Sequence, residues 1–142
     1  MSGRRYRTLP PERRREILDS LRRVLESSGV LLAVVFGSFV EMSSFHDVDV
    51  AVYGLGDDLD RLSAVSAAFE EKTGIPLDIV PLAKLPPASR IRVLSRGLVI
   101  VERVPGLYEA LLMRAWDDVI RAEIASRPRR TSAETRSQAS EA

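Results

Sequence analysis

The strongest constraint on the fold is an apolar, largely β-branched run at residues 30–36 that stops abruptly at Gly37-Ser38. A run of this length without a polar side chain predicts a strand that is buried on both faces. A buried strand needs neighbouring strands and covering helices. The remaining sequence should therefore supply both.

Helical and strand patterns alternate along the rest of the chain. Strands are expected at residues 47–53, 75–80 and 98–101. Helices are expected from Pro10-Pro11 to near Gly29, from an Asp57 or Asp58 cap to Gly74, over residues 86–95, and from Pro105-Gly106 to about Ser126. This order predicts an α/β (α+β) fold in which helices flank a small mixed sheet, and a βαβ unit joins the second and third strands.

Apolar side chains recur on one side of the helix that ends at Gly74. Their spacing predicts that this helix packs through one face. The residues predicted to point inward are Leu59, Leu62, Val65 and Phe69.

Two carboxylates stand two residues apart where the second strand begins, at Asp47 and Asp49. Alternate residues of a strand point to the same face, so these groups lie roughly 6 to 7 Å apart along the backbone. Carboxylates at this spacing can converge on a hard cation. Phosphoryl and nucleotidyl transfer use two Mg²⁺ ions about 3.5 to 4 Å apart.

The turn at Gly37-Ser38 carries features of a phosphate site. Gly37 lets the backbone approach a ligand closely, and Ser38 adds a hydroxyl group. A helical start after this turn would direct free backbone N–H groups at an anion. The turn and the Asp47-x-Asp49 pair together predict a metal-dependent nucleotide site.

These elements resemble the nucleotidyltransferase superfamily that includes DNA polymerase β, and in particular its minimal nucleotidyltransferase branch. That branch combines Gly-Ser, a spacer, Asp-x-Asp and a third carboxylate on a later strand, which here is Asp78. The resemblance extends over residues 12–125 and implies the polymerase-β-like fold. It also implies two Mg²⁺ ions held by Asp47, Asp49 and Asp78, and an ATP substrate whose β and γ phosphates contact Gly37 and Ser38.

Asp78 interrupts an otherwise apolar strand, where an unpaired buried charge would be costly. We interpret Asp78 as a working carboxylate. By the resemblance it ligates the catalytic metal and helps to deprotonate the acceptor. The structural alternative is an exposed position on a half-solvated strand, or an ion pair with Arg90.

The resemblance implies Mg²⁺-dependent transfer of AMP from ATP to a hydroxyl group. Minimal nucleotidyltransferases that act as antitoxins modify a tyrosine of a small helical HEPN toxin, so a HEPN-type protein is the expected partner. Two departures favour an alternative, a catalytically weak or inactive antitoxin that neutralises its partner by forming a complex. The spacer between Ser38 and Asp47 is shorter than is usual in the family, and Glu41 stands where the family tends to carry arginine.

Composition fits a single small domain of 142 residues, which we place at residues 10–126 between a flexible basic segment, 1–9, and a disordered tail, 127–142. The sequence has no cysteine, and no apolar run of membrane-spanning length. The N-terminus lacks the apolar core of a secretory signal. The expected location is the cytoplasm.

The net charge is only +1, although arginines such as Arg7 and Arg14 crowd the start of the chain. Acidic residues are mixed among them, which favours a solvated helix face over a nucleic-acid-binding arm. Nucleic acid is therefore not an expected partner. The last helix could provide a homo- or hetero-oligomer interface through its apolar residues, Leu107, Leu111, Leu112, Trp116 and Ile120.

Other polar side chains near the motifs have two interpretations each. Lys84, Arg90 and Arg92 are candidates for neutralising a triphosphate, or for surface ion pairs. His46, the only histidine, could contact a phosphate, but a lone histidine at a strand start favours an incidental role.

Overall fold

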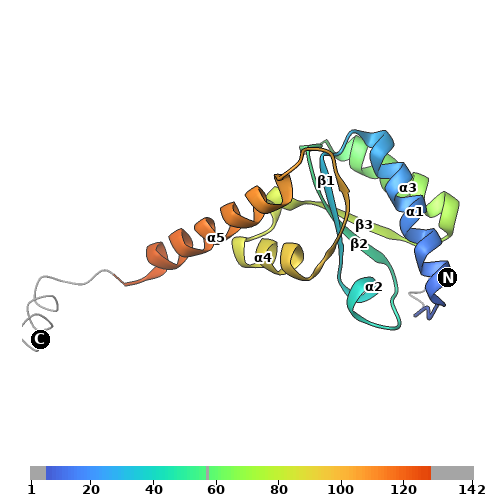
Figure 1. Cartoon of the computed structure of the whole chain (residues 1–142), viewed down its shortest axis with the longest axis horizontal. Helices are drawn as coiled ribbons and strands as arrows, with labels where there is room; N and C mark the ends of the chain where they lie inside the picture. Colours follow the sequence, from blue (N-terminus) through green and yellow to red (C-terminus); the bar gives the residue numbers. More distant parts are fainter. Residues whose placement is uncertain (1–5, 57, 129–142) are drawn as a thin grey trace, which may run out of the picture.

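The computed structural model describes residues 6–56 and 58–128, which form a four-stranded sheet with helices on both faces (Figure 1). The strand order is β3-β2-β1-β4. β1 (Leu32–Phe36) pairs antiparallel with β2 (Val48–Tyr53) and with β4 (Leu98–Glu102). β2 pairs parallel with β3 (Leu77–Pro81). The mixed sheet confirms the predicted fold class.

Two layers of helices cover the sheet (Figure 1). The helices α1 (Pro11–Ser28) and α3 (Leu59–Thr73) pack together on one face. On the other face lie α4 (Pro87–Arg96) and α5 (Leu107–Ser126). Since α3 connects the parallel strands β2 and β3, the predicted βαβ unit is confirmed.

The side chains of β1 alternate between two apolar clusters. Ala33 and Val35 belong to the cluster under α1 and α3, whereas Leu32 and Val34 belong to the cluster under α4. All four side chains are buried. The prediction that this strand is buried on both faces is therefore confirmed, and burial of both faces fixes its register.

The same alternation in β2 determines where its polar side chains lie. Val48, Val50 and Val52 are buried under α1 and α3. Asp49 consequently lies on the α4 side of the sheet. Asp49 is paired in register with Asp78 in β3 on one side and with Phe36 in β1 on the other.

The helix ends follow the expected signals, with one error in the predicted core. Asp58 caps α3 by accepting a hydrogen bond from the Arg61 backbone N–H at 3.2 Å, whereas Asp57 lies outside the described residues. Leu59 was expected to point inward, but its side chain is 73% exposed. The expectation is wrong because Leu59 is the first residue of α3, and the buried face of this helix begins one turn later, at Leu62.

The residues just before α1 are attached to the domain. Arg7 forms an antiparallel bridge with Phe45, and its guanidinium donates hydrogen bonds to the carbonyls of His46, at 3.0 Å, and Gly74, at 3.2 Å. The expectations of a flexible start and a disordered tail concern mainly residues 1–5 and 129–142. These two segments lie outside the described residues. The domain limits of 10–126 stay a prediction.

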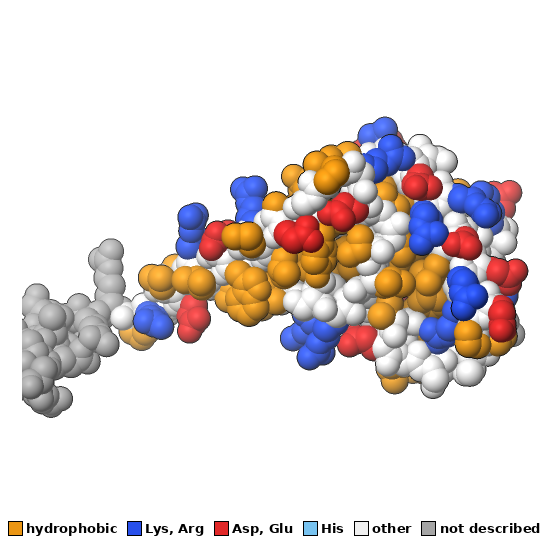
Figure 2. Space-filling model, viewed as in Figure 1, with side chains coloured by type: hydrophobic (Ala, Val, Ile, Leu, Met, Phe, Trp, Pro, Cys, Tyr) orange, Lys and Arg blue, Asp and Glu red, His pale blue; other side chains and the backbone are white. Residues whose placement is uncertain are grey.

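The helix α5 packs on α4 with its first half and then projects away from the sheet (Figure 1). Apolar side chains lie exposed along the projecting part (Figure 2). They include Met113, Trp116, Ile120 and Ile124, each more than half exposed. Within residues 6–56 and 58–128, no helix combines the length and the apolar character needed to cross a membrane.

Candidate active site

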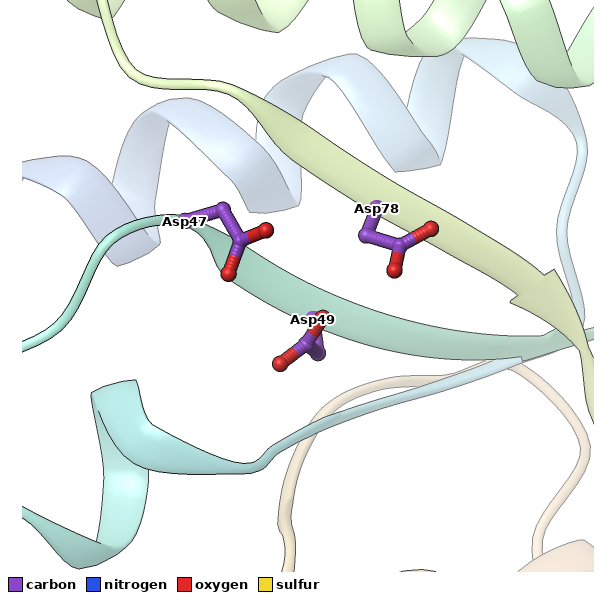
Figure 3. Close-up of side chains that lie close together, drawn as sticks. All are labelled: Asp47, Asp49 and Asp78. Carbon is purple, nitrogen blue, oxygen red and sulfur yellow. The ribbon is translucent and has the colours of Figure 1, made fainter. Parts of the chain in front are cut away.

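Three carboxylates meet at one end of the parallel strand pair (Figure 3). Asp47 directly precedes β2, Asp49 lies within it, and Asp78 is its neighbour in β3. One oxygen from each side chain lies within 4.8 Å of the other two. The three residues singled out from the sequence, although separated by as many as 31 positions, are therefore adjacent in space.

Asp78 is exposed, which corrects the premise that it is a buried charge. β3, which η1 (Leu82–Lys84) follows directly, is an edge strand of the sheet, so one side of it has no neighbouring strand. The suggested pairing with Arg90 is also absent, because Arg90 instead forms an ion pair with Asp118 at 3.0 Å. Asp78 can therefore be reached by another molecule.

The surroundings of Asp49 disfavour its charged form. Burial raises its pKa from the ordinary value of 3.8 to about 7, and repulsion from the neighbouring Asp47 and Asp78 carboxylates adds to this. A cation placed among the three groups would remove the repulsion. Because carboxylate oxygens are the ligands that Mg²⁺ prefers, these side chains fit a magnesium site.

The turn at Gly37 lies directly against this cluster. Gly37 has φ 80° and ψ −156°, a conformation that side-chain-bearing residues rarely adopt. A Cβ atom built on Gly37 would lie 2.5 Å from the Asp49 Oδ2 atom. Both the backbone geometry and the contact with Asp49 therefore require glycine. Half-buried Ser38 follows as the first residue of the short helix α2 (Ser38–Glu41).

We expect Gly37→Ala to lower the free energy of unfolding by about 2 to 4 kcal/mol, because it combines backbone strain with a clash against Asp49. Urea denaturation measures this. Gly29→Ala is the matched control, since Gly29 has φ 88° but nothing within 4 Å of a built Cβ. Equal losses for the two variants would contradict a contact between the turn and Asp49.

Arg14 anchors the segment that follows the Gly37 turn. Arg14 of α1 donates hydrogen bonds to the carbonyls of Phe39, Met42 and Ser43, the last two at 3.0 Å. Its guanidinium also lies 4.8 Å from the Phe39 ring centroid and 5.2 Å from that of Phe45. The sequence interpretation missed this role, because nothing in the arginine spacing distinguishes Arg14 from its solvated neighbours.

Replacing Arg14 by alanine should lower the free energy of unfolding by about 2 to 3 kcal/mol, since three carbonyls lose a charged donor. Thermal and urea unfolding measure the loss. Arg15→Ala, one residue along on the exposed face of α1, serves as the control and should cost less than about 0.5 kcal/mol. Similar values for both variants would show that Arg14 anchors nothing.

His46 has a packing role beside the cluster. Its ring centroid lies 3.6 Å from that of Tyr6, with an interplanar angle of 37°. Within the described part of the chain, its Nδ1 atom is buried and has no hydrogen-bond partner. The ring therefore packs against Tyr6, a contact that could not be predicted from the sequence.

The sequence of residues 19–105, more than half of the chain, matches the family described as Polymerase beta, Nucleotidyltransferase. No curated protein is similar enough in sequence to count as a match.

Solved structures share the fold. A chain from the complex of a tri-AMPylated Shewanella oneidensis HEPN toxin with an MNT antitoxin has a TM-score of 0.64 and 15% identity, over 79% of this chain and 91% of the matched one. A chain from a toxin–antitoxin structure with AMP-PNP has a TM-score of 0.65 and 15% identity, over 76% and 90%. A structure described as a minimal nucleotidyltransferase has a TM-score of 0.56 and 25% identity, over 63% and 95%.

Proposed function

Since the chain belongs to the polymerase β nucleotidyltransferase family, we propose that it transfers AMP from ATP to a hydroxyl group in a Mg²⁺-dependent reaction. The observation that carries this proposal is the convergence of three carboxylates against the Gly37 turn. In this proposal the Gly37 turn is a phosphate-binding site, and the three carboxylates beside it are a cation-binding site. A nucleoside triphosphate with its metal needs both.

Asp47, Asp49 and Asp78 would hold the magnesium, with two ions expected from the family resemblance. When bound, Mg²⁺ neutralises phosphate charge and holds the attacking and leaving oxygens in place. Gly37 and Ser38 bind the β and γ phosphates, because the glycine lets the backbone come close and the serine offers a hydroxyl donor. Together these groups orient the α-phosphate toward the sheet edge.

The reaction forms one bond and breaks one bond at the α-phosphorus. The acceptor oxygen bonds to phosphorus while the bond from phosphorus to the bridging oxygen breaks, and pyrophosphate leaves with that electron pair. The acceptor loses its proton to the Asp78 carboxylate, which is exposed and passes the proton to solvent. An exposed base suits an acceptor carried by another macromolecule.

The acceptor we propose is a tyrosine hydroxyl of a small helical HEPN-type protein, so that the chain acts as an antitoxin in the cytoplasm. Structural similarity to the complex of an AMPylated HEPN toxin with its antitoxin supports this choice. The exposed apolar side chains of α5, among them Trp116 and Ile120, offer a surface for such a partner or for a second copy of the chain.

Glu41 and the shortened spacer favour a second candidate function, neutralisation of the partner by complex formation with a weak or inactive site. An acid at position 41, beside the turn, opposes binding of a triphosphate. The apolar surface of α5 would serve this function equally well.

Incubation with [α-³²P]ATP, MgCl₂ and the helical protein encoded by the adjacent gene tests the proposal. We expect label on a tyrosine of the partner and release of pyrophosphate, whereas [γ-³²P]ATP should leave the partner unlabelled. Omission of Mg²⁺ should prevent labelling. A partner that is inhibited but never labelled would contradict the enzyme and support the second function.

A further inference from the structure

A cavity of about 310 Å³ opens beside the Gly37 turn, between the end of β1 and one face of α4. Phe36 and Val93 give it apolar walls, and Gly37 and Glu41 border it from the turn and α2. Arg92 and Arg96 border it from α4. The sequence interpretation considered Arg92 and overlooked Arg96, although a spacing of four residues places both on the same side of a helix.

This cavity adjoins the carboxylate cluster at Gly37. Phe36 is the register partner of Asp49 and points to the same face of the sheet. Gly37 borders the cavity and also lies against the Asp49 carboxylate. A ligand that extends from the three carboxylates across the turn therefore enters the space beneath the two arginines.

The charges around the cavity favour an anionic ligand. The Arg96 Nη1 atom lies 3.9 Å from the Glu41 Oε1 atom, and both side chains are largely exposed, so the pair contributes little stability. Breaking this ion pair to let Arg96 bind another anion therefore costs little free energy. A guanidinium can bind two phosphate oxygens at once, and both arginines are exposed and can therefore be reached by a phosphate group.

We propose that Arg96, with Arg92, binds the β and γ phosphates of the nucleotide, and that Arg96 leaves its weak ion pair with Glu41 to do so. This inference rests on the proposed function. The positive charge that the family tends to place at position 41 is supplied here from α4. As the bond to the α-phosphorus breaks, the pyrophosphate gains negative charge, which these arginines neutralise.

Equilibrium binding of a non-hydrolysable ATP analogue with Mg²⁺, and separately of AMP, tests the proposal by calorimetry. Arg96→Glu should raise the Kd of the analogue by roughly 10- to 100-fold, the effect expected for loss of a charge-assisted contact. The Kd of AMP, which lacks the β and γ phosphates, should stay within about twofold. Arg121→Glu makes the same charge change on exposed α5 and should alter neither value.

The charge-swapped double variant Glu41→Arg/Arg96→Glu provides the sharper test, because it restores one cation and one anion at the pair. Its Kd for the analogue should return to within about fivefold of the wild-type value. Equal weakening of AMP and analogue binding by Arg96→Glu would overturn the proposal, and so would an unchanged analogue affinity. A wild-type protein that binds no analogue would overturn the proposed function and this inference together.

Discussion

Asp49→Asn is expected to abolish nucleotidyl transfer, with kcat/KM reduced by at least about 1,000-fold. Asp49 is the carboxylate that lies against the Gly37 turn, and both other acids of the cluster repel its charge. Asparagine keeps the shape of the side chain but removes the charge that a cation requires. The rate of label transfer from [α-³²P]ATP to the partner measures the effect.

A direct measurement of metal binding separates loss of the site from loss of folding. Mn²⁺ titration followed by electron paramagnetic resonance should show binding to the wild type and none to Asp49→Asn, while circular dichroism stays unchanged. Asp60→Asn, on the exposed first turn of α3, is the matched control and should retain full activity and metal binding. A variant at Asp49 that keeps a tenth of the wild-type rate would rule out the assigned role.

The shared face of Asp47 and Asp49 could be predicted from the alternation of a strand, and Asp78 was added to them by the family resemblance. Asp47 and Asp49 share a face by the alternation of a strand, and Asp78 joins them because a helix of one-sided apolar pattern makes β2 and β3 parallel neighbours. Only the first step uses residues close in sequence, whereas the second depends on the pairing of β2 with β3 across α3. The Gly37 turn could be predicted on the same grounds, since it follows an uninterrupted apolar strand.

The exposure of Asp78 and the roles of Arg14 and Arg96 could not be predicted in this way. Whether a strand residue is buried depends on which strand lies at the sheet edge and on how far the helices above it extend. Arg14 contacts carbonyls 25 to 29 residues away, and Arg96 in α4 pairs with Glu41 in α2. Such pairs arise from tertiary packing, which leaves no periodic signal in the sequence.

The metal-free protein should lose stability as the pH rises from about 4 to 7, and Asp49 is the cause. Its pKa is about 7 in the folded protein and near 3.8 when unfolded, so in this interval the folded state binds more protons than the unfolded state. The free energy of unfolding therefore decreases with rising pH. The full difference between the folded and unfolded pKa values would correspond to about 4 kcal/mol of unfolding free energy. Solvent screening of this half-buried group reduces the expected loss to about 1 to 2 kcal/mol.

Urea denaturation of the metal-free protein at pH 4.5, 6 and 8 measures this dependence. Asp49→Asn removes the titrating group, so at pH 8 the variant should be more stable than the wild type by about 1 to 2 kcal/mol, although it is the inactive one. Saturating Mg²⁺ should recover the wild-type loss at pH 8 and leave the variant unchanged, because only the wild type gains a bound cation. Asp60→Asn should follow the wild-type curve. Destabilisation of the metal-free protein by Asp49→Asn at pH 8 would contradict this prediction. It would show that repulsion among the three carboxylates does not lower the free energy of unfolding. A cation would then have no repulsion to relieve at this site.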